Sequence, residues 1–288
     1  MMLGDMQIFV TRDLADLAAH VREFLTGRPI EHNVMATVVD TLEPSGCTDP
    51  PLLAWVQAGA SGKITGVVLR TPPRFLLTSD LSEEGAGALM PRLLEIDPEL
   101  PGVSGPQPAA SHLAAAWRQC TGGTVAPGMR QAIYWLAQVT EAPGRPAGFA
   151  RVGNRSDRDL VIEWTSAFCR DAGVPAIGGQ SGVDRRLRDG QMLLWEDERV
   201  VSMAGSRPPV AGVVRLGPVY TPPEARCRGY ATALVADVSR RALAAGATKC
   251  MLYTDLANET SNKIYQAVGY RRSHDAQEYV FRSAGRSG

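Results

Sequence analysis

Two stretches in the second half of this 288-residue chain decide its fold. Residues 226–232 read RCRGYAT and lead into residues 233–245, a run that predicts an amphipathic helix. Its apolar positions recur at helical spacing, at Ala231, Leu234, Val235, Val238 and Ala242. Residues 258–270 read NETSNKIYQAVGY and predict a second, shorter helix that ends at Gly269.

The first stretch has the composition of a phosphate-binding loop. The first N–H groups of a helix have no partner within the helix and lie at the positive end of its dipole. Gly229 and Ala231 are small enough for a ligand to approach the backbone, and Arg226 and Arg228 add positive charge. An ordinary helix start with surface arginines would look the same. Neither G-x-x-x-x-G-K-[ST] nor G-x-G-x-x-G occurs, which disfavours an ATPase or a Rossmann fold.

The segment before this loop predicts an irregular strand. Residues 212–220 read GVVRLGPVY, and an internal Gly217-Pro218 usually marks a bulge or a break in strand pairing. Further along, Asn258, Glu259 and Thr260 suit the cap and first turn of the second helix.

Together these residues resemble the GNAT superfamily of acyl-CoA-dependent N-acyltransferases. Arg226-x-x-Gly229-x-Ala231 resembles its R/Q-x-x-G-x-G/A signature. Residues 258–270 resemble a second conserved block, N-x-x-A-x-x-L-Y-x-x-x-G-F/Y, with Tyr265 at the tyrosine position. The likeness covers roughly residues 150–288 and implies an α/β (α+β) fold, a mixed, mostly antiparallel sheet flanked by helices.

The resemblance also implies where acetyl-CoA binds. It places the pantetheine arm along the backbone of Val219, Tyr220 and Thr221. It places the pyrophosphate on Arg226, Cys227, Arg228, Gly229, Tyr230, Ala231 and Thr232. Asn258 and Asn262 would hydrogen-bond near the pantetheine, although Asn262 could equally be a solvated helix residue.

The implied reaction is direct attack of an amine, in a small molecule or a peptide, on the thioester. Tyr265 is the implied catalytic residue beside the leaving sulfur; the alternative is a tyrosine packed in the core. Glu163, Glu224 and Asp255 are equal candidates for a base, and water is a further one. A non-catalytic acyl-CoA sensor is the alternative function. Trp164, Phe168, Trp195 and Met203 could line an acceptor pocket but suit the core better.

The N-terminal half has a similar order of strand-like and helix-like runs. Residues 141–148, EAPGRPAG, suit a domain boundary, so we expect a degenerate GNAT-like domain over residues 1–145 and a catalytic domain over residues 149–288. Residues 101–106, PGVSGP, stand where a signature loop would be expected. The first 150 residues carry 10 basic and 15 acidic side chains and the rest 20 and 15. A basic half could attract an anionic cofactor, although random scatter would give the same counts.

Composition excludes other classes of protein. Thirty basic residues balance thirty acidic ones, which disfavours nucleic-acid binding. The five cysteines and four histidines lack metal-ligand or disulfide spacing, so no metal is expected. No signal peptide or membrane span is apparent, and we expect a cytoplasmic protein. The oligomeric state and the acyl acceptor are not predicted.

Overall fold

The computed structural model of the protein describes residues 6–41, 51–140, 144–175 and 178–283. The chain divides into two compact units. Unit 1 comprises residues 1–131 and 274–288, and unit 2 comprises residues 132–273.

The described elements follow the same order twice: strand, two helices, three strands, helix, strand, helix, strand. The first set is β1 (Met6–Thr11), α1 (Leu14–Gly27), α2 (Asn33–Thr41), β2 (Leu52–Ala58), β3 (Lys63–Arg70), β4 (Leu76–Thr78), α3 (Glu83–Ile96), β5 (Gly102–Pro106), α4 (Gln107–Thr121) and β6 (Thr124–Leu136). The second set is β7 (Phe149–Val152), α5 (Arg158–Ala172), α6 (Gly179–Arg188), β8 (Met192–Asp197), β9 (Arg199–Ser206), β10 (Val213–Tyr220), α7 (Tyr230–Ala244), β11 (Lys249–Asp255), α8 (Glu259–Val268) and β12 (Arg271–Arg282).

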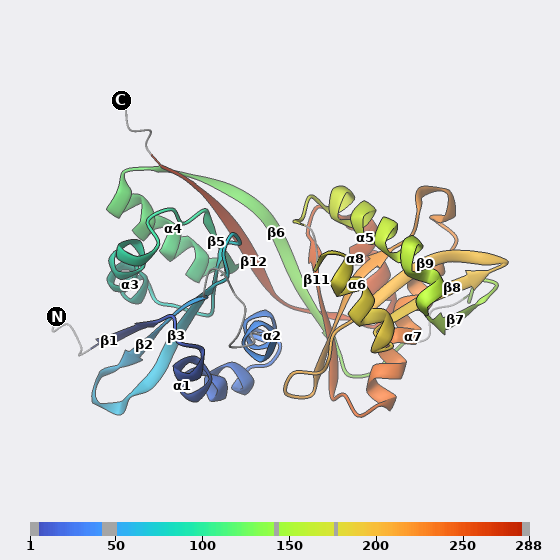
Figure 1. Ribbon diagram of the computed structural model, residues 1–288, viewed down its shortest axis with the longest axis horizontal. Coiled ribbons are helices and arrows are strands. Elements are labelled where there is room, and N and C mark those ends of the chain that lie inside the picture. The colour runs from blue at the N-terminus through green and yellow to red at the C-terminus, as the bar shows by residue number, and fades with distance from the viewer. Residues whose placement is uncertain (1–5, 42–50, 141–143, 176–177, 284–288) are drawn as a thin grey trace. The chain divides into compact units, whose positions relative to one another are not determined.

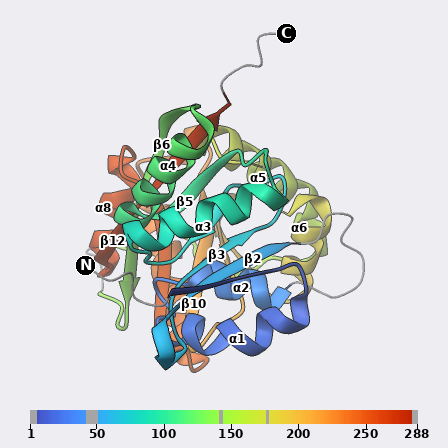
Figure 2. The ribbon, with the colours of Figure 1, turned by 90° about the vertical axis from the view of Figure 1, so that its left-hand side faces the viewer.

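In unit 1 the strands are ordered β1-β2-β3-β4-β5-β12-β6. The pair β4–β5 is parallel, and β12 runs antiparallel to β5, with Ala276 opposite Pro106. Figure 1 shows α1 and α2 on one side of these strands and α3 and α4 on the other, and Figure 2 shows the same layers from the side. Successive side chains of β2 therefore point to opposite faces of the sheet, and Leu52, Ala54 and Val56 pack on the face that α3 and α4 cover.

In unit 2 the strand order is β6-β11-β10-β9-β8-β7. On one face, Leu234 and Val235 of α7 and Tyr265 of α8 pack on the strands. On the other, Trp164 of α5 and Val183 of α6 do so. This mixed, mostly antiparallel sheet between helices confirms the expected fold class.

The final strands of the two sets are exchanged, which explains why the compact units do not divide at residues 141–148. Strand β12, the last of the second set, pairs with β5 of the first, and β6, the last of the first set, neighbours β11 of the second. Each of these long strands has residues in both units. The compact units therefore follow the exchanged strands, whereas the repeat in element order changes between β6 and β7.

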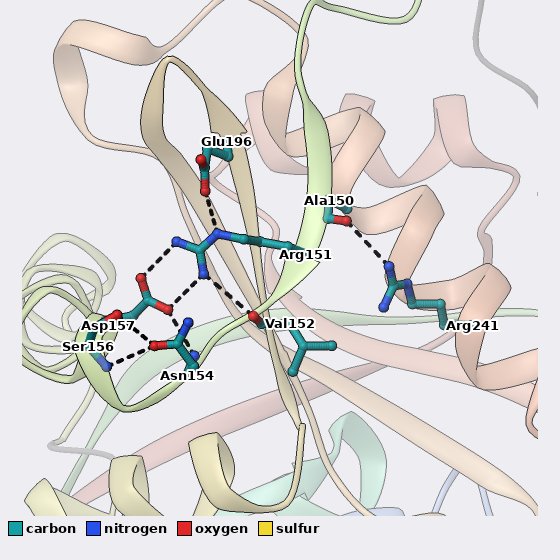
Figure 3. Close-up of polar contacts among 8 residues, drawn as sticks. All are labelled: Ala150, Arg151, Val152, Asn154, Ser156, Asp157, Glu196 and Arg241. Atoms are coloured by element: carbon teal, nitrogen blue, oxygen red, sulfur yellow. Dashed lines mark hydrogen bonds and ion pairs between the residues drawn. The ribbon is translucent and has the colours of Figure 1, made fainter.

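A cluster of polar side chains holds together the first elements of the second set, which lie in unit 2. Arg151 of β7 donates two hydrogen bonds, of 2.7 and 2.8 Å, to the carboxylate of Asp157, and its Nε contacts Glu196 of β8 (Figure 3). Asp157 also accepts the Asn154 N–H at 2.8 Å, in a capping box directly before α5. The cluster thus ties β7, β8 and the first turn of α5 together.

The structure contains some of the elements expected from the sequence and several that the sequence did not indicate. The two predicted helices of the second half are present as α7 and α8, and the second ends before Gly269 as expected. The position suggested for a signature loop, residues 101–106, was wrong, because residues 102–106 form strand β5. By element order, the counterpart of the loop before α7 lies between β4 and α3. β1, α1, α2, β7 and α6 were not predicted. Among the described residues, no helix is long and apolar enough to cross a membrane.

Candidate functional site

The central feature of unit 2 is an opening between two of its strands. β10 pairs in parallel with β11 only from Val213 to Arg215, although β10 continues to Tyr220 and β11 to Asp255. On its other edge, β10 pairs with β9 with a shift in register between Leu216 and Val219, so the predicted break at Gly217-Pro218 is confirmed. Opposite the bulge lies Gly205, where a Cβ atom would come within 3.0 Å of the Gly217 carbonyl oxygen.

The three residues predicted to contact pantetheine, Val219, Tyr220 and Thr221, differ in whether their backbone groups already form hydrogen bonds. The Tyr220 carbonyl accepts a hydrogen bond from Ser202 Oγ at 3.2 Å, and the Thr221 carbonyl accepts one from Arg226 Nε at 2.9 Å. Adjacent residues of a strand direct their peptide groups to opposite edges. Because the Tyr220 carbonyl is directed to β9, the peptide groups of Val219 face the opening toward β11.

Arg226 organises the loop that follows β10. Besides the bond to Thr221, its guanidinium group forms an ion pair with Asp171 of α5 at 2.9 Å and lies 5.9 Å from the centre of the Tyr220 ring. These contacts occupy much of its donor capacity. Arg226 therefore holds the shape of the loop, whereas Arg228 is exposed.

The loop turns sharply into α7. Cys227 and Gly229 both have positive φ values, 61° and 81°, and Gly229 is the N-cap residue, with no side chain to cap the helix. The first intrahelical bond runs from the Ala233 N–H to the Gly229 carbonyl. The amides of Tyr230, Ala231 and Thr232 thus lie at an uncapped, positive helix end.

A side-chain hydrogen bond anchors Tyr230, the first residue of α7. The Tyr230 hydroxyl donates to Asp197 at 2.5 Å, and this bond, followed by burial, raises the pKa of Tyr230. The contact fixes the start of α7 against the β8–β9 hairpin.

The two asparagines of α8 have different roles. Asn258 caps the helix, since its Oδ1 accepts the Ser261 N–H at 3.0 Å. Asn262 donates from Nδ2 to the carbonyls of Asp255 and Asn258, at 3.0 and 2.9 Å. Its Oδ1 is buried and accepts no hydrogen bond from any described residue. Asn262 therefore retains one unsatisfied acceptor at the end of β11.

Tyr265 lies in the core on the inner face of α8. It is 8% exposed, its ring meets that of Tyr270 edge-on at 6.0 Å, and burial raises its pKa to about 12. It is therefore neutral at physiological pH and can act as a hydrogen-bond donor.

A match to a protein family covers the strand opening, the loop before α7 and both helices α7 and α8, but not Asp171 on α5. Residues 178–270, from α6 to the start of β12, match the Acetyltransferase (GNAT) family. Residues 178–270 are a GNAT acetyltransferase domain.

Solved structures extend the likeness of fold to the entire chain. A GCN5-related N-acetyltransferase from Sphaerobacter thermophilus is 15% identical, with a TM-score of 0.63 over 98% of this chain and 97% of its own. A GNAT-family acetyltransferase from Colwellia psychrerythraea is 12% identical, with a TM-score of 0.63 over 96% and 100%. A tandem GNAT protein from the clavulanic acid biosynthesis pathway is 12% identical, with a TM-score of 0.56 over 99% and 100%. No curated protein matches the chain in sequence.

The three candidate bases lie on three different elements: α5, the loop before α7 and the end of β11. Glu163 on α5 and Glu224 in the loop are exposed, and Asp255 accepts the Ala257 N–H at 2.9 Å in the turn after β11. Trp164, Trp195 and Met203 are buried in the cores, and Phe168 is half-buried on α5.

Sequence reasoning missed the residues that support the GNAT site from outside its motifs. Asp171, Ser202, Asp197 and Gly205 come from α5 and the β8–β9 hairpin. Ser202 Oγ is 2.8 Å from Thr221 Oγ1 as well as bonding to Tyr220. Only their proximity in three dimensions reveals them, because none belongs to a recognisable spacing.

Proposed function

We propose that unit 2 is an acyl-CoA-dependent N-acetyltransferase that binds acetyl-CoA in the opening between β10 and β11. The observation that carries the proposal is the early end of β10–β11 pairing directly before the uncapped start of α7, within a GNAT domain. This arrangement offers strand peptide groups to an extended arm and helix amides to a pyrophosphate.

The residues present suit this ligand. The backbone N–H and C=O of Val219 can pair with the pantetheine arm. Asn262 Oδ1, buried and without a partner among the described residues, can accept an amide N–H of that arm once its side chain turns toward the opening. The amides of residues 227–232 would bind the pyrophosphate, with Arg228 adding charge. Asn258 contributes through the cap of α8, which fixes the position of Asn262.

The chemistry is acyl transfer. Acetyl-CoA supplies a thioester; the amine nitrogen forms a bond to the acyl carbon, the carbon–sulfur bond breaks, and CoA leaves as a thiolate. The amine nitrogen gives up one proton in becoming an amide, and the thiolate takes up a proton from solvent. Tyr265 donates a hydrogen bond toward the leaving sulfur. Full proton transfer from a tyrosine of pKa about 12 to a thiolate of pKa ~8.5 would be uphill by about 5 kcal/mol, so hydrogen bonding is its role.

The amine must lose a proton before or during attack. For an amine of pKa ~10.4, deprotonation at pH 7 costs about 4.6 kcal/mol. Glu163, Glu224, Asp255 and water remain the candidates for this step. Holding both substrates together supplies a large share of the rate, because effective molarities of aligned groups reach about 10⁵ M or more.

Thermal unfolding with acetyl-CoA tests the binding, and release of free thiol with a panel of amines tests the activity. At about 100 times its dissociation constant, acetyl-CoA should stabilise the protein by ~2.7 kcal/mol. An unchanged melting temperature at millimolar acetyl-CoA would overturn the proposal.

A non-catalytic acyl-CoA sensor is the second candidate. It is favoured by the exposure of Glu163 and Glu224 and by the structural bond of Asp255. Tight binding of acetyl-CoA without thiol release for any amine would select it.

A further inference from the structure

Two arginines on the α5–α6 face of unit 2 have no counterion among the residues that the structure describes. Arg186 of α6 is 3% exposed, and its Nε is buried with no hydrogen-bond partner among the described residues. Arg215 of β10 lies on the same face, since its neighbours Val214 and Leu216 pack on the α7–α8 side. Neither arginine forms an ion pair with a described carboxylate. By contrast, Arg151, Arg158 and Arg226 of the same unit each pair with an aspartate.

Backbone contacts bring these two arginines near one another. The Gln191 N–H bonds to the Arg186 carbonyl and the Ser206 N–H to the Gln191 carbonyl, each at 2.8 Å, and Ser206 lies opposite Leu216, the neighbour of Arg215. Burial, and then the like charges of Arg207 and Arg215, lower the pKa of Arg186 to about 10. Burial likewise lowers the pKa of Arg215. The backbone N–H of Arg207 also bonds to the Arg215 carbonyl at 2.9 Å, which brings the turn after β9 to the same place. Buried charges without partners are costly to a folded protein, so such a cluster suits a site that an anion completes.

The cluster lies beside the opening described above. Arg215 is the last residue of β10 that pairs with β11, opposite Met251. At about 3.3 Å per residue, its backbone lies roughly 10 Å along the strand from the bulge. Tyr220, further along β10, meets Trp164 of α5 at 5.9 Å on the same face. This face is opposite the one on which Tyr265 packs.

We propose that Arg186 and Arg215 form an anion-binding site that holds a carboxylate or phosphate group of the acyl acceptor. The role of this anion as part of an acceptor rests on the proposed acetyltransferase function; the binding of an anion does not. The acceptor is then an amine that carries an oxyanion roughly 10 Å or less from its nitrogen. An Arg pair recognises either oxyanion through planar, charge-assisted hydrogen bonds.

The first test needs no acceptor. We expect Arg186→Met to raise the melting temperature by about 2–4 °C or more, because it removes an uncompensated buried charge from a well-packed site. Arg185→Met, a change at an exposed position of the same helix, should leave it within about 1 °C. A lower melting temperature for Arg186→Met would overturn the proposal, since Arg186 would then be a structural group.

The second test compares anions at constant ionic strength with CoA present, so that the loop before α7 is occupied. Inorganic phosphate or acetate should raise the melting temperature of the full-length protein and of Arg185→Met. The rise should be lost in Arg186→Met and Arg215→Met. Equal responses of all four proteins to both anions would overturn the anion site while leaving CoA-induced stabilisation, and with it the proposed function, intact.

The third test identifies the acceptor group. Phosphoethanolamine is compared with ethanolamine, and 4-aminobutanoate with its amide, as acceptors in the thiol-release assay. The anionic member of one pair should have a kcat/KM at least tenfold higher, and Arg215→Met should abolish this preference. The pair that responds distinguishes phosphate from carboxylate. If neutral amines are acetylated as well as both anions, the acceptor assignment is overturned.

Discussion

Tyr265 and Tyr270 are neighbours in the core, yet only one hydroxyl is engaged. The Tyr270 hydroxyl lies 2.8 Å from Ser239 Oγ, whereas no described group hydrogen-bonds to that of Tyr265. Burial raises the pKa of both, so both hydroxyls are neutral at physiological pH. Tyr265 is therefore the one with a donor to offer to a ligand.

We expect Tyr265→Phe to lower kcat by about 10- to 150-fold with little change in the dissociation constant of acetyl-CoA. A hydrogen bond to a charged group contributes about 1.5–3 kcal/mol, and the charge on sulfur develops only during the reaction. Steady-state kinetics and calorimetric titration measure the two quantities. Tyr270→Phe is the matched control: it should lower stability and leave kcat within about twofold. An unchanged kcat in Tyr265→Phe would remove its catalytic role.

Asp157 contributes to stability through its pair with Arg151 (Figure 3). Its pKa lies below the ordinary value, first because of the hydrogen bonds from Arg151. A carboxylate with a lowered pKa stabilises the folded state above its unfolded pKa, near 3.8, and loses that contribution as the pH falls through the folded pKa.

Asp157→Asn should therefore lower the free energy of unfolding by about 1.5–3 kcal/mol at pH 7, and the difference from wild type should shrink below about pH 4. Urea denaturation at several pH values measures both effects. Asp159→Asn, at a side chain that is 96% exposed, should change stability by less than about 0.5 kcal/mol. A loss that stayed constant down to pH 2 would contradict the charge-based account.

Among the elements, α7 has a left-handed glycine at each end. Gly229 caps its start with φ 81°, and Gly246 follows its end with φ 99°. A Cβ at 229 would point toward Pro146, 3.8 Å away, and one at 246 would meet nothing within 4 Å. Either position tolerates a side chain only at the cost of backbone strain.

This symmetry gives a controlled test of the phosphate-binding loop. Gly229→Ala and Gly246→Ala should each lower stability by about 1–2 kcal/mol through the same strain. Only Gly229→Ala should weaken acetyl-CoA binding, by about tenfold, because it shifts the amides at the start of α7. Titration calorimetry on both variants decides; equal affinities would place the pyrophosphate elsewhere.

The elements also show what local sequence can predict. Helix 83–96 was predictable because Ser82 caps it and two glutamates begin it, and the break in β10 because Gly217-Pro218 cannot continue a regular ladder. α6 escaped prediction because its two glycines and three arginines give little apolar periodicity. The role of Arg226 was only partly predictable, since its partner Asp171 lies 55 positions earlier in the chain.

For the whole molecule, the exchange of β6 and β12 is the feature that sequence could not predict. β6 and β12 have the same kind of residue pattern, and the sequence around each strand does not determine which neighbouring strand it pairs with. β12 nevertheless supplies the residues opposite Gly102–Pro106 in unit 1, and Phe281 stacks on Trp117 at 4.4 Å in its core.

Truncation after Asp275 should therefore destabilise unit 1, which lies mainly in the first half of the chain. Loss of Phe281 alone should cost about 3–5 kcal/mol, and β5 loses its antiparallel partner while keeping its parallel pairing with β4. Hydrogen exchange should report lost protection at residues 102–106, whereas truncation after Arg282 should preserve it. Full protection of β5 in the shorter protein would show that another strand replaces β12.

The same exchange sets an order of events during synthesis. The residues that complete the sheet of unit 1 leave the ribosome only after all of residues 132–273 have been made. At about 5–20 residues per second, β5 waits on the order of ten seconds or more for its partner strand. The nascent chain must keep that strand edge from pairing wrongly for the whole of this interval.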